Sequence, residues 1–384
     1  MRIADRVKNL PPYLFAELDK KIERKRAGGV DVISLGVGDP DEPTPAHIVE
    51  VLREAAMDPA THQYPSYYGM PELRRAIADW YRARFGVELD PDTEVQPLIG
   101  SKEGIAHIAW AFLDPGDEAL IPDPGYPVYE IGTRLAGGTP VSFPHPADEG
   151  FLPDMRSAPI SPRTRLMWLG FPSNPTAAVA ELSVFDEAVA FAREHNLLLA
   201  HDAAYSEMTY DGYVAPSVLQ VDGAKDVAIE FGSASKTFNM TGWRIGWAVG
   251  NAEAIRALAT VKTNIDSGIF DAIQRATIAA LTGPMDHLEQ ARERYRRRRD
   301  LLVGTLNDLG WQVKPPLGSF YVWVPTRDGA SSAEFGELLL ERAGVVVAPG
   351  AGYGAAGEGW IRFSLTVPDD RLEEATQRIA KALE

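Results

Sequence analysis

The chain has 384 residues, enough for about two domains at roughly 150 residues each. Hydrophobic residues make up 45% of it and charged residues 24%, which is typical of a globular protein with a sizeable core. The net charge of −16 disfavours a nucleic-acid or membrane partner, and the absence of cysteine excludes disulfides, thiolate catalysis and cysteine-based zinc sites.

No apolar run approaches the ~20 residues that span a bilayer, and the first residues, MRIADRVKNLPPYLF, lack a hydrophobic signal core. We therefore expect a cytoplasmic enzyme without a metal site. Residues 1–30 predict an arm followed by a helix, because the two prolines of LPPYLF resist regular structure. An arm that exposed Tyr13 would be costly for a monomer, so we expect it to pack on another part of the protein or on another subunit.

Residues 32–40, VISLGVGDP, predict a short strand that ends in a glycine-rich turn. This is either a plain turn or a place where Gly38 presents its backbone N–H to an anionic ligand. Residues 46–56 predict a helix, and a tyrosine-rich loop, HQYPSYYG, then leads into an amphipathic helix that begins near Pro71.

From residue 93 to about 249 the pattern of strand, loop and helix repeats. Apolar strands that alternate with amphipathic helices predict an α/β fold, with an open, mostly parallel seven-stranded sheet between helices. In such sheets ligands gather at the carboxyl ends of the strands. The predicted strands are 95–99, 119–121, 140–143, 166–170, 197–201, 227–231 and 245–249.

Polar residues follow several of these strands. Ser101 and Lys102 open a helix, where backbone N–H groups and the helix dipole favour a phosphate. Tyr126 follows the second strand and belongs either to the core or to a surface that stacks on a flat ligand. Asn174 follows the fourth strand and precedes a proline, a pair that is common in turns and sometimes has a cis bond.

Asp202 lies just past the fifth predicted strand, so we expect it to be nearly buried, where a carboxylate needs a cationic partner or becomes protonated. Tyr205 follows three residues later. We interpret the neighbouring His201 as a strand-end histidine with satisfied hydrogen bonds.

Lys236 lies in FGSASKTFNMTGWRIGWAVG, between Ser233 and Ser235 on one side and Arg244 on the other. It is either a loop lysine in water or a Schiff-base lysine that carries an aldehyde cofactor. Serines and an arginine so close to it would suit a phosphate.

The last third predicts a long helix, then short strands and two helices, which we interpret as a smaller α+β domain. The run RERYRRRR (292–299) lies in the long helix, and we interpret it as a solvated helix face. Arg362 lies inside a strand pattern. It either faces water or points into a cleft, where it could grip a carboxylate with two hydrogen bonds.

Asp202-x-x-Tyr205, Ser233-x-Ser235-Lys236 and then Arg244 form a specific combination, with Asn174-Pro175 upstream. It resembles the class I/II aminotransferases, pyridoxal-phosphate enzymes of fold type I, over essentially the whole chain. Within that family the chain is most similar to the LL-diaminopimelate aminotransferases. The segments that carry this similarity are LPPYLF, LGVGDPDEPTP, HQYPSYYGM, GSKEGIAH, PDPGYPVY, HDAAYSE and NMTGWRIG.

The resemblance implies that Lys236 holds pyridoxal 5′-phosphate covalently and moves a proton between the substrate α-carbon and the cofactor. Asp202 would pair with the protonated pyridine nitrogen, Tyr205 and Asn174 would hydrogen-bond the ring 3′-oxygen, and Tyr126 would stack on the ring. The implied phosphate ligands are Ser101, Lys102, Ser233, Ser235, Arg244 and, from the neighbouring subunit of a homodimer, Tyr64.

The resemblance further implies that Arg362 clamps the substrate α-carboxylate, helped by the Gly38 backbone. Other residues implied near the substrate are Tyr13, Lys102, Asn174 and Asn264. The expected partners are an amino acid and a 2-oxo acid, most simply LL-diaminopimelate and 2-oxoglutarate. The alternatives are an aminotransferase for aspartate, alanine or an aromatic amino acid, and a pyridoxal-phosphate lyase on the same fold.

One residue departs from the family pattern: where the family reads Asn-Pro-Thr-Gly, this chain has Ala177. If the turn needs a positive φ, alanine costs about 1 kcal/mol there or shifts the turn. The expected division is an arm with part of a small domain (1–45), a large cofactor-binding domain (46–284) and a small C-terminal domain (285–384).

Overall fold

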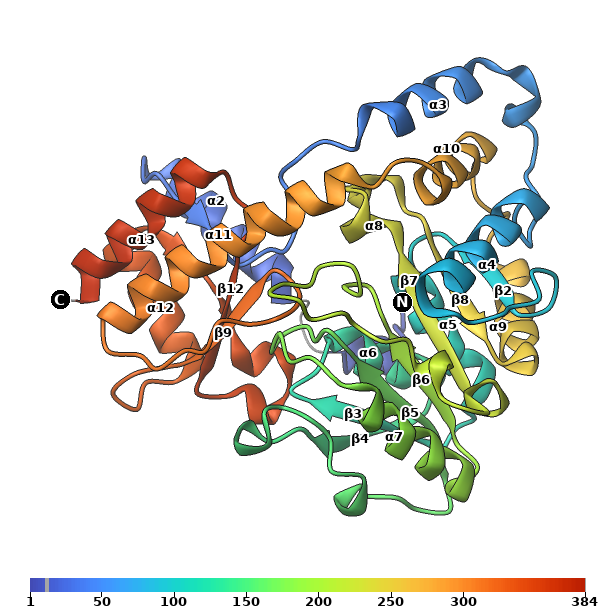
Figure 1. Cartoon of the computed structure of the whole chain (residues 1–384). Coiled ribbons are helices and arrows are strands. Elements are labelled where there is room, and N and C mark those ends of the chain that lie inside the picture. Colours follow the sequence, from blue (N-terminus) through green and yellow to red (C-terminus); the bar gives the residue numbers. More distant parts are fainter. Residues whose placement is uncertain (11–13, 384) are drawn as a thin grey trace.

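A seven-stranded sheet forms the centre of the computed structural model, which describes residues 1–10 and 14–383 (Figure 1). Its strands pair in parallel except for β8, which runs antiparallel to both of its neighbours. In spatial order they are β2 (Val95–Leu98), β8 (Gly246–Gly250), β7 (Ala228–Ser233), β6 (Leu198–Asp202), β5 (Thr164–Gly170), β3 (Glu118–Asp123) and β4 (Thr139–Pro144). The predicted α/β architecture is confirmed, with every predicted strand within three residues of its observed bounds.

Helices cover both faces of this sheet because the strands are apolar on both sides. One apolar cluster joins strand residues to α5 (Ser101–Phe112), α6 (Pro127–Ala136) and α9 (Ala252–Ile265). A second cluster lies on the other face, with α3 (Ala46–Met57), α4 (Pro71–Phe85), α7 (Leu182–His195) and α10 (Asp271–Thr282). The carboxyl ends of the parallel strands lie between these two helix layers.

The C-terminal part has its own apolar cluster, built around β9 (Tyr321–Pro325), α12 (Ser332–Ala343), β12 (Trp360–Ser364) and α13 (Asp369–Leu383). Strands β11 (Ala348–Pro349), β12 and β9 form an antiparallel sheet. Strand β1 (Ile33–Ser34) pairs in parallel with β10 (Val345–Val346), so the N-terminal segment joins this part. The remaining helices near the N-terminus are α1 (Asp5–Lys8) and α2 (Leu14–Ala27).

Helix α11 (Asp286–Asp308) runs from the side of the short helix α8 (Ala234–Thr237) to the C-terminal cluster (Figure 1). The interpretation of its arginine run as a solvated face is wrong for Arg298 and Arg299, whose side chains are 4% and 3% exposed. These two residues lie three and four positions beyond Tyr295, so helix geometry places them on the buried stripe. Arg298 pairs with Asp41 and Asp369, and Arg299 pairs with Asp211.

No helix in the described part of the chain is long and apolar enough to cross a membrane. The proposed boundaries at residues 45 and 284 stay a prediction.

Candidate active site

A cavity of about 330 Å³ opens at the carboxyl edge of the sheet, a size in the usual range for small-ligand sites. Loops that follow β2, β3, β5, β6 and β7 meet there, because these strands all point the same way. The cavity brings together predicted site residues from across the sequence. Its lining residues are Val37, Gly38, Ser101, Lys102, Tyr126, Asn174, Asp202, Ala204, Tyr205, Ser233, Ser235, Lys236, Thr241, Arg244 and Tyr321.

Lys236 lies on α8, directly after β7, so it is not a loop lysine in water. Its Nζ donates a hydrogen bond to the carbonyl oxygen of Gly38 at 3.1 Å. The pKa of Lys236 is lowered from 10.5 to about 8, mainly by burial and also by the charges of Arg244 and Arg362, whereas the charges of Asp39 and Asp202 oppose the fall. A larger fraction of this amine than of an exposed lysine is therefore unprotonated near neutral pH and able to act as a nucleophile.

Asp202 ends β6 on the floor of the cavity. Its Oδ2 accepts a hydrogen bond from the hydroxyl of Tyr129 at 2.9 Å, and its Oδ1 accepts one from the backbone N–H of Ala204 at 3.2 Å. Burial raises the pKa of this carboxyl group, and the bond from Tyr129 counteracts that rise. A buried carboxylate with few partners suits a cationic group of a ligand.

Hydroxyls, a helix N-terminus and an arginine line one end of the cavity. Ser101 is the first residue of α5, and Ser233 caps α8 by accepting a hydrogen bond from the Ser235 N–H at 3.2 Å. Gly100 has a φ of +77°, and a Cβ there would lie 2.3 Å from Nη2 of Arg244. Only glycine lets this arginine approach the helix N-terminus, and together they form a cradle for an anion.

Arg362 is fully buried behind the wall of the cavity, so the water-facing alternative is wrong. Its Nη1 donates to Oδ1 of Asn174 at 2.6 Å, and its Nη2 donates to the carbonyl oxygen of Gly36 at 2.7 Å. The guanidinium also lies 3.9 Å from the ring centroid of Tyr321 and 5.0 Å from that of Tyr353. These contacts fix the plane of a cation within reach of the site.

Two predicted site residues of the described chain, Tyr64 and Asn264, do not line this cavity, and Arg362 lies behind its wall. Tyr64 is 86% exposed, and Asn264, exposed on α9, donates a hydrogen bond to the Thr260 carbonyl oxygen at 2.8 Å. Tyr13 lies outside the described residues.

Two tyrosines of the site were not singled out from the sequence. Tyr129 contacts Asp202, and the hydroxyl of Tyr321 lies 3.0 Å from that of Tyr205. Tyr321 is also close to Gly38, where a Cβ would lie 2.0 Å from the Tyr321 hydroxyl. Tyr129 had a sequence signal, since it follows Tyr126 by three residues at the start of a predicted βα unit; the strand that carries Tyr321 has no such cue.

His201 is a buried residue at the strand end, as the sequence indicated. Its Nδ1 lies 2.8 Å from Oε2 of Glu230, and this carboxylate also accepts hydrogen bonds from Tyr81 at Oε1 and from Ser217 at Oε2. The prediction that both ring nitrogens of His201 are hydrogen-bonded holds only for Nδ1, because Nε2 has no hydrogen-bond partner among the described residues. This network belongs to the core. The described residues contain no group of three or more histidine and acidic side chains placed to hold a metal ion.

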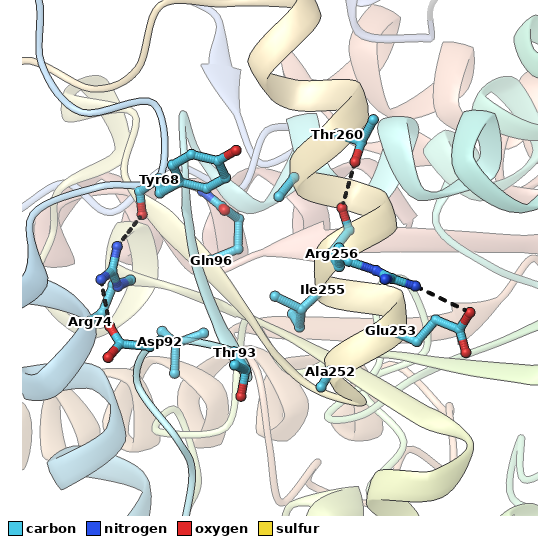
Figure 2. A pocket seen from close by; sticks show the side chains of 12 residues that line it. Tyr68, Arg74, Asp92, Thr93, Gln96, Ala252, Glu253, Ile255, Arg256 and Thr260 are labelled. Carbon is cyan, nitrogen blue, oxygen red and sulfur yellow. Dashed lines mark hydrogen bonds and ion pairs between the residues drawn. The ribbon is translucent and has the colours of Figure 1, made fainter.

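A larger cavity, of about 780 Å³, lies between α4, β2 and α9 (Figure 2). Its charged residues pair with one another: Arg74 with Asp92 at 2.7 Å, and Arg256 with Glu253 at 3.5 Å. It contains no lysine and no buried carboxylate, so the Lys236 cavity is the better candidate for catalysis.

Comparison with known proteins also identifies the chain as an enzyme, over its full length. The profile of the family described as aminotransferase class I and II matches residues 30–379. The chain is 56% identical over 382 residues to an LL-diaminopimelate aminotransferase of Desulforudis audaxviator, covering 99% of this chain and 97% of that protein. It is 54% identical over 385 residues to the enzyme of the same name from Moorella thermoacetica, covering 100% and 99%.

Solved structures with the same fold include substrate-bound BacF from Bacillus subtilis, with a TM-score of 0.95, 38% identity and coverage of 99% of this chain and 98% of that one. Aspartate aminotransferase from Thermus thermophilus with maleate has a TM-score of 0.93, 36% identity and full coverage of both chains. With a matching family profile, relatives over half identical and a lysine-centred cavity at the sheet edge, this chain belongs to the class I and II aminotransferases and has their type I fold.

Proposed function

We propose that this chain is a pyridoxal-phosphate-dependent aminotransferase that moves an amino group between LL-diaminopimelate and 2-oxoglutarate. The observation that carries the proposal is the cavity in which Lys236, with a pKa of about 8, lies among Asp202, Tyr205 and an anion cradle. The names of the two relatives that are more than half identical support the choice of substrate. The proposal includes a role in lysine biosynthesis, a cytoplasmic location and a homodimeric state.

The residues present fit pyridoxal phosphate. The cradle of Ser101, Ser233, Ser235 and Arg244 offers hydroxyls, a helix N-terminus and a guanidinium to a phosphate. Asp202, whose pKa is raised by burial, gains a cationic partner when the pyridine nitrogen is protonated. Tyr126 presents an aromatic face to a flat ring, and Tyr205 presents a hydroxyl.

The bound cofactor supplies an electron sink for the electron pair of the substrate Cα–H bond. Lys236 would hold the cofactor through Nζ, and the same amine would move a proton between the substrate α-carbon and the cofactor side. Such a positioned acid–base group contributes about 10²–10⁴-fold in rate. Asp202 would pair with the protonated ring nitrogen of the cofactor, and the hydrogen bond from Tyr129 orients that carboxylate.

Arg362 binds the substrate carboxylate. Its Nη1 and Nη2 already point at two oxygen acceptors, Asn174 Oδ1 and the Gly36 carbonyl. Its contact with the Tyr321 ring holds the guanidinium in one plane. A planar arginine held in this way matches a carboxylate by two parallel hydrogen bonds, which fixes the α-carbon near Lys236.

The test is a spectral titration of the cofactor-loaded enzyme with LL-diaminopimelate, glutamate, aspartate, alanine and phenylalanine. Amino transfer to the cofactor changes its visible absorbance. We expect a fast change with LL-diaminopimelate and glutamate and little change with aspartate. A response of similar rate to every amino acid would replace the substrate assignment by a general aminotransferase, and release of product without return of the amino group would indicate a lyase.

Two variants test the residue roles. Lys236→Ala should lower turnover by about 10²-fold or more, and wild-type turnover would refute the role of Lys236. Arg362→Lys keeps the charge and loses the two-pronged grip, so KM for the amino acid should rise about tenfold while the cofactor absorbance stays. Loss of cofactor instead would mean that Arg362 serves the cofactor.

A further inference from the structure

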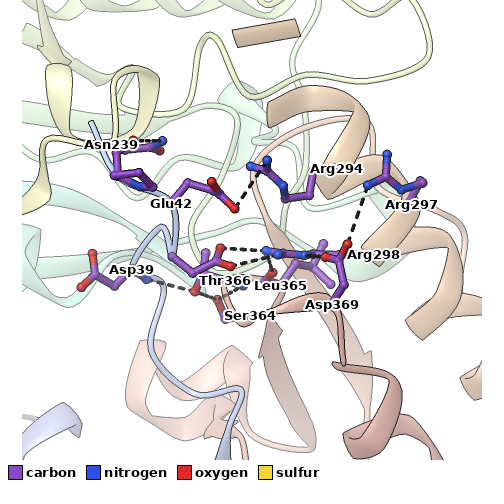
Figure 3. A network of polar contacts seen from close by, with 12 residues as sticks. Asp39, Glu42, Asn239, Arg294, Arg297, Arg298, Ser364, Leu365, Thr366 and Asp369 are labelled. Atoms are coloured by element: carbon purple, nitrogen blue, oxygen red, sulfur yellow. Dashed lines mark hydrogen bonds and ion pairs between the residues drawn. The ribbon is translucent and has the colours of Figure 1, made fainter. Parts of the chain in front are cut away.

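Arg298 is a buried cation outside the cavity, in the arginine run of α11. Its Nη1 and Nη2 donate to the two carboxylate oxygens of Asp41 at 2.8 and 2.9 Å, and its Nε donates to Asp369 at 2.6 Å (Figure 3). Nη1 also donates to the Leu365 carbonyl oxygen at 3.1 Å. The Asp41 side chain is 14% exposed and the Asp369 side chain 53%, so the two-pronged pair with Asp41 is the buried one.

Asp41 belongs to residues 36–44, GVGDPDEPT, here called the anchored segment. It contains no helix or strand, and within the described chain no backbone-to-backbone hydrogen bond involves it. Side chains fix its position instead. Besides Arg298, the Thr366 hydroxyl donates to the Val37 carbonyl oxygen and accepts from the Asp39 N–H, both at 3.1 Å.

The far end of the anchored segment is tied to the loop after α8. The Thr44 hydroxyl donates to the Asn239 carbonyl oxygen at 2.8 Å, and Nδ2 of Asn239 donates to the Pro43 carbonyl oxygen at 3.3 Å. Arg294, one turn before Arg298, lies 3.5 Å from Glu42 (Figure 3). The segment therefore bridges the C-terminal part and the strand–helix unit that carries Lys236.

The anchored segment also contacts both charged groups of the site. The Gly38 carbonyl oxygen accepts from Lys236 Nζ at 3.1 Å, and the Gly36 carbonyl oxygen accepts from Arg362 Nη2 at 2.7 Å. The charge of Asp39 raises the pKa of Lys236 against the effect of burial. A shift of this segment would therefore change the surroundings of the lysine and of the arginine together.

We propose that Arg298 is a positioning residue that, by gripping Asp41, holds the anchored segment across Lys236 and sets the place of Gly38 at the substrate end of the cavity. Arg298 itself does not line the cavity. A guanidinium suits this task because its planar fork fixes a carboxylate in direction as well as distance. This role rests on the proposed aminotransferase function, since it concerns how the amino acid is held.

The test compares Asp41→Asn with Asp369→Asn in the cofactor-loaded enzyme. Each variant removes one anionic partner of the same arginine, but only Asp41 lies on the anchored segment. We expect Asp41→Asn to raise KM for the amino acid at least about tenfold with a smaller change in kcat, because a shift of the segment that holds Gly38 weakens binding of the amino acid more than it changes the reaction step. Asp369→Asn should stay within about twofold of wild type in both constants.

A second readout uses the apoenzyme and needs no turnover. The rate at which Lys236 takes up pyridoxal phosphate is measured against pH, and the midpoint of that pH dependence reports the pKa of Lys236. In Asp41→Asn this midpoint should fall, because Asp39 moves with the segment and its charge no longer raises the pKa of Lys236 as much. Thr366→Val removes the hydroxyl that bonds to Val37 and Asp39 of the segment and leaves Arg298 unchanged. It should raise KM and lower the midpoint, as Asp41→Asn does.

The outcomes separate the possibilities. If wild type turns over and Asp41→Asn matches Asp369→Asn in KM and in midpoint, Arg298 has only a structural role and the proposal is wrong. If Asp41→Asn does not fold, Thr366→Val decides in the same way. If wild type transfers no amino group, the proposed function fails, and the apoenzyme midpoints still decide whether the anchored segment acts on Lys236.

Discussion

At the scale of single residues, the burial that makes the Lys236 amine reactive also lowers the stability of the apoenzyme. Its pKa falls from 10.5 to about 8 because burial disfavours the charged form. Below about pH 8 the folded apoenzyme must keep this cation buried, whereas the unfolded chain solvates it. The unfolded state binds the extra proton between pH 8 and 10.5, so the stability of the apoenzyme should rise with pH across that window.

Lys236→Met should therefore stabilise the apoenzyme below pH 8 by up to about 3 kcal/mol, at about 1.4 kcal/mol for each unit of pKa shift. The advantage should fade as the pH rises from 8 to 10.5. Urea unfolding at several pH values measures it. Lys314→Met, at an exposed lysine, is the control and should show no such trend. A constant difference for Lys236→Met would contradict the buried-cation account.

Ala177 has a φ of +58°, so the turn beside Asn174 does use the left-handed region that glycine favours. The strain of about 1–2 kcal/mol is offset, since the methyl group is 4% exposed and packs in an apolar cluster. A buried methyl contributes about 0.8 kcal/mol, and alanine also lowers the entropy of the unfolded chain. The departure from the family glycine is thus compensated locally.

Ala177→Gly should change the free energy of unfolding by less than about 1 kcal/mol in either direction. Gly86 makes the comparison: it has a φ of +69°, and a Cβ there would contact nothing within 4 Å. Gly86→Ala gains no packing and should destabilise by about 1 kcal/mol. Thermal unfolding of both variants checks this, and a large stabilisation by Ala177→Gly would show that packing does not compensate for the strain.

At the scale of elements, the end of α9 depends on a buried ion pair. The side chain of Lys262 is 1% exposed, and its Nζ lies 2.5 Å from Oδ1 of Asp266, one turn later. The same oxygen accepts from the Gly268 N–H at 2.8 Å. This pair fixes the turn that follows Asn264 and packs Gly268 against the loop near Ser66.

Asp266→Asn leaves the Lys262 cation buried and unpaired, so it should destabilise the protein by about 3–5 kcal/mol. Adding Lys262→Met should restore part of that loss, because it removes the unpaired charge. Glu253→Gln is the control on the same helix: its pair with Arg256 is exposed, so the change should stay below about 1 kcal/mol. Urea unfolding measures all three, and similar losses for Asp266→Asn and Glu253→Gln would refute the account.

At the scale of the whole molecule, two segments, residues 62–68 and 265–270, expose large apolar and aromatic side chains. Tyr64 is 86% exposed, Ile265 50% and Phe270 40%. The two segments lie close together, since the ring centroids of His62 and Phe270 are 6.4 Å apart. Exposed apolar groups gathered in this way suit a subunit interface, and the proposed homodimer would cover them.

Ile265→Asp should weaken the proposed dimer, raising its dissociation constant at least about tenfold, as loss of a buried apolar contact at an interface does. Sedimentation velocity measures the change. Leu317→Asp, at a similarly exposed leucine of the C-terminal part, is the control and should leave association intact. A wild-type protein that stays monomeric at micromolar concentration would contradict the dimer.

The sequence alone determined the succession of strands and helices along the chain and the polar residues that follow several of the strands. These depend on short-range patterns: apolar runs for buried strands, a spacing of three and four for helices, and loops where chains reverse. Since parallel strands end at one edge, the strand pattern predicted that Ser101, Asn174 and Asp202 lie near that edge, and the family resemblance added Lys236. The spacing of apolar residues also predicted the buried face of α11. Arg298 and Arg299 lie on that face but were assigned to the solvent because they are charged.

Only the tertiary structure decided which distant side chains contact one another. Tyr129 faces Asp202, Tyr321 lies over Arg362, and Asp41 pairs with Arg298 across more than 250 residues of chain. No local pattern encodes such pairs, because they depend on how separate elements pack. The structure also showed Arg362 to be buried, which a strand pattern could not decide, since alternate positions of a strand face opposite sides and the sequence does not say which side is covered.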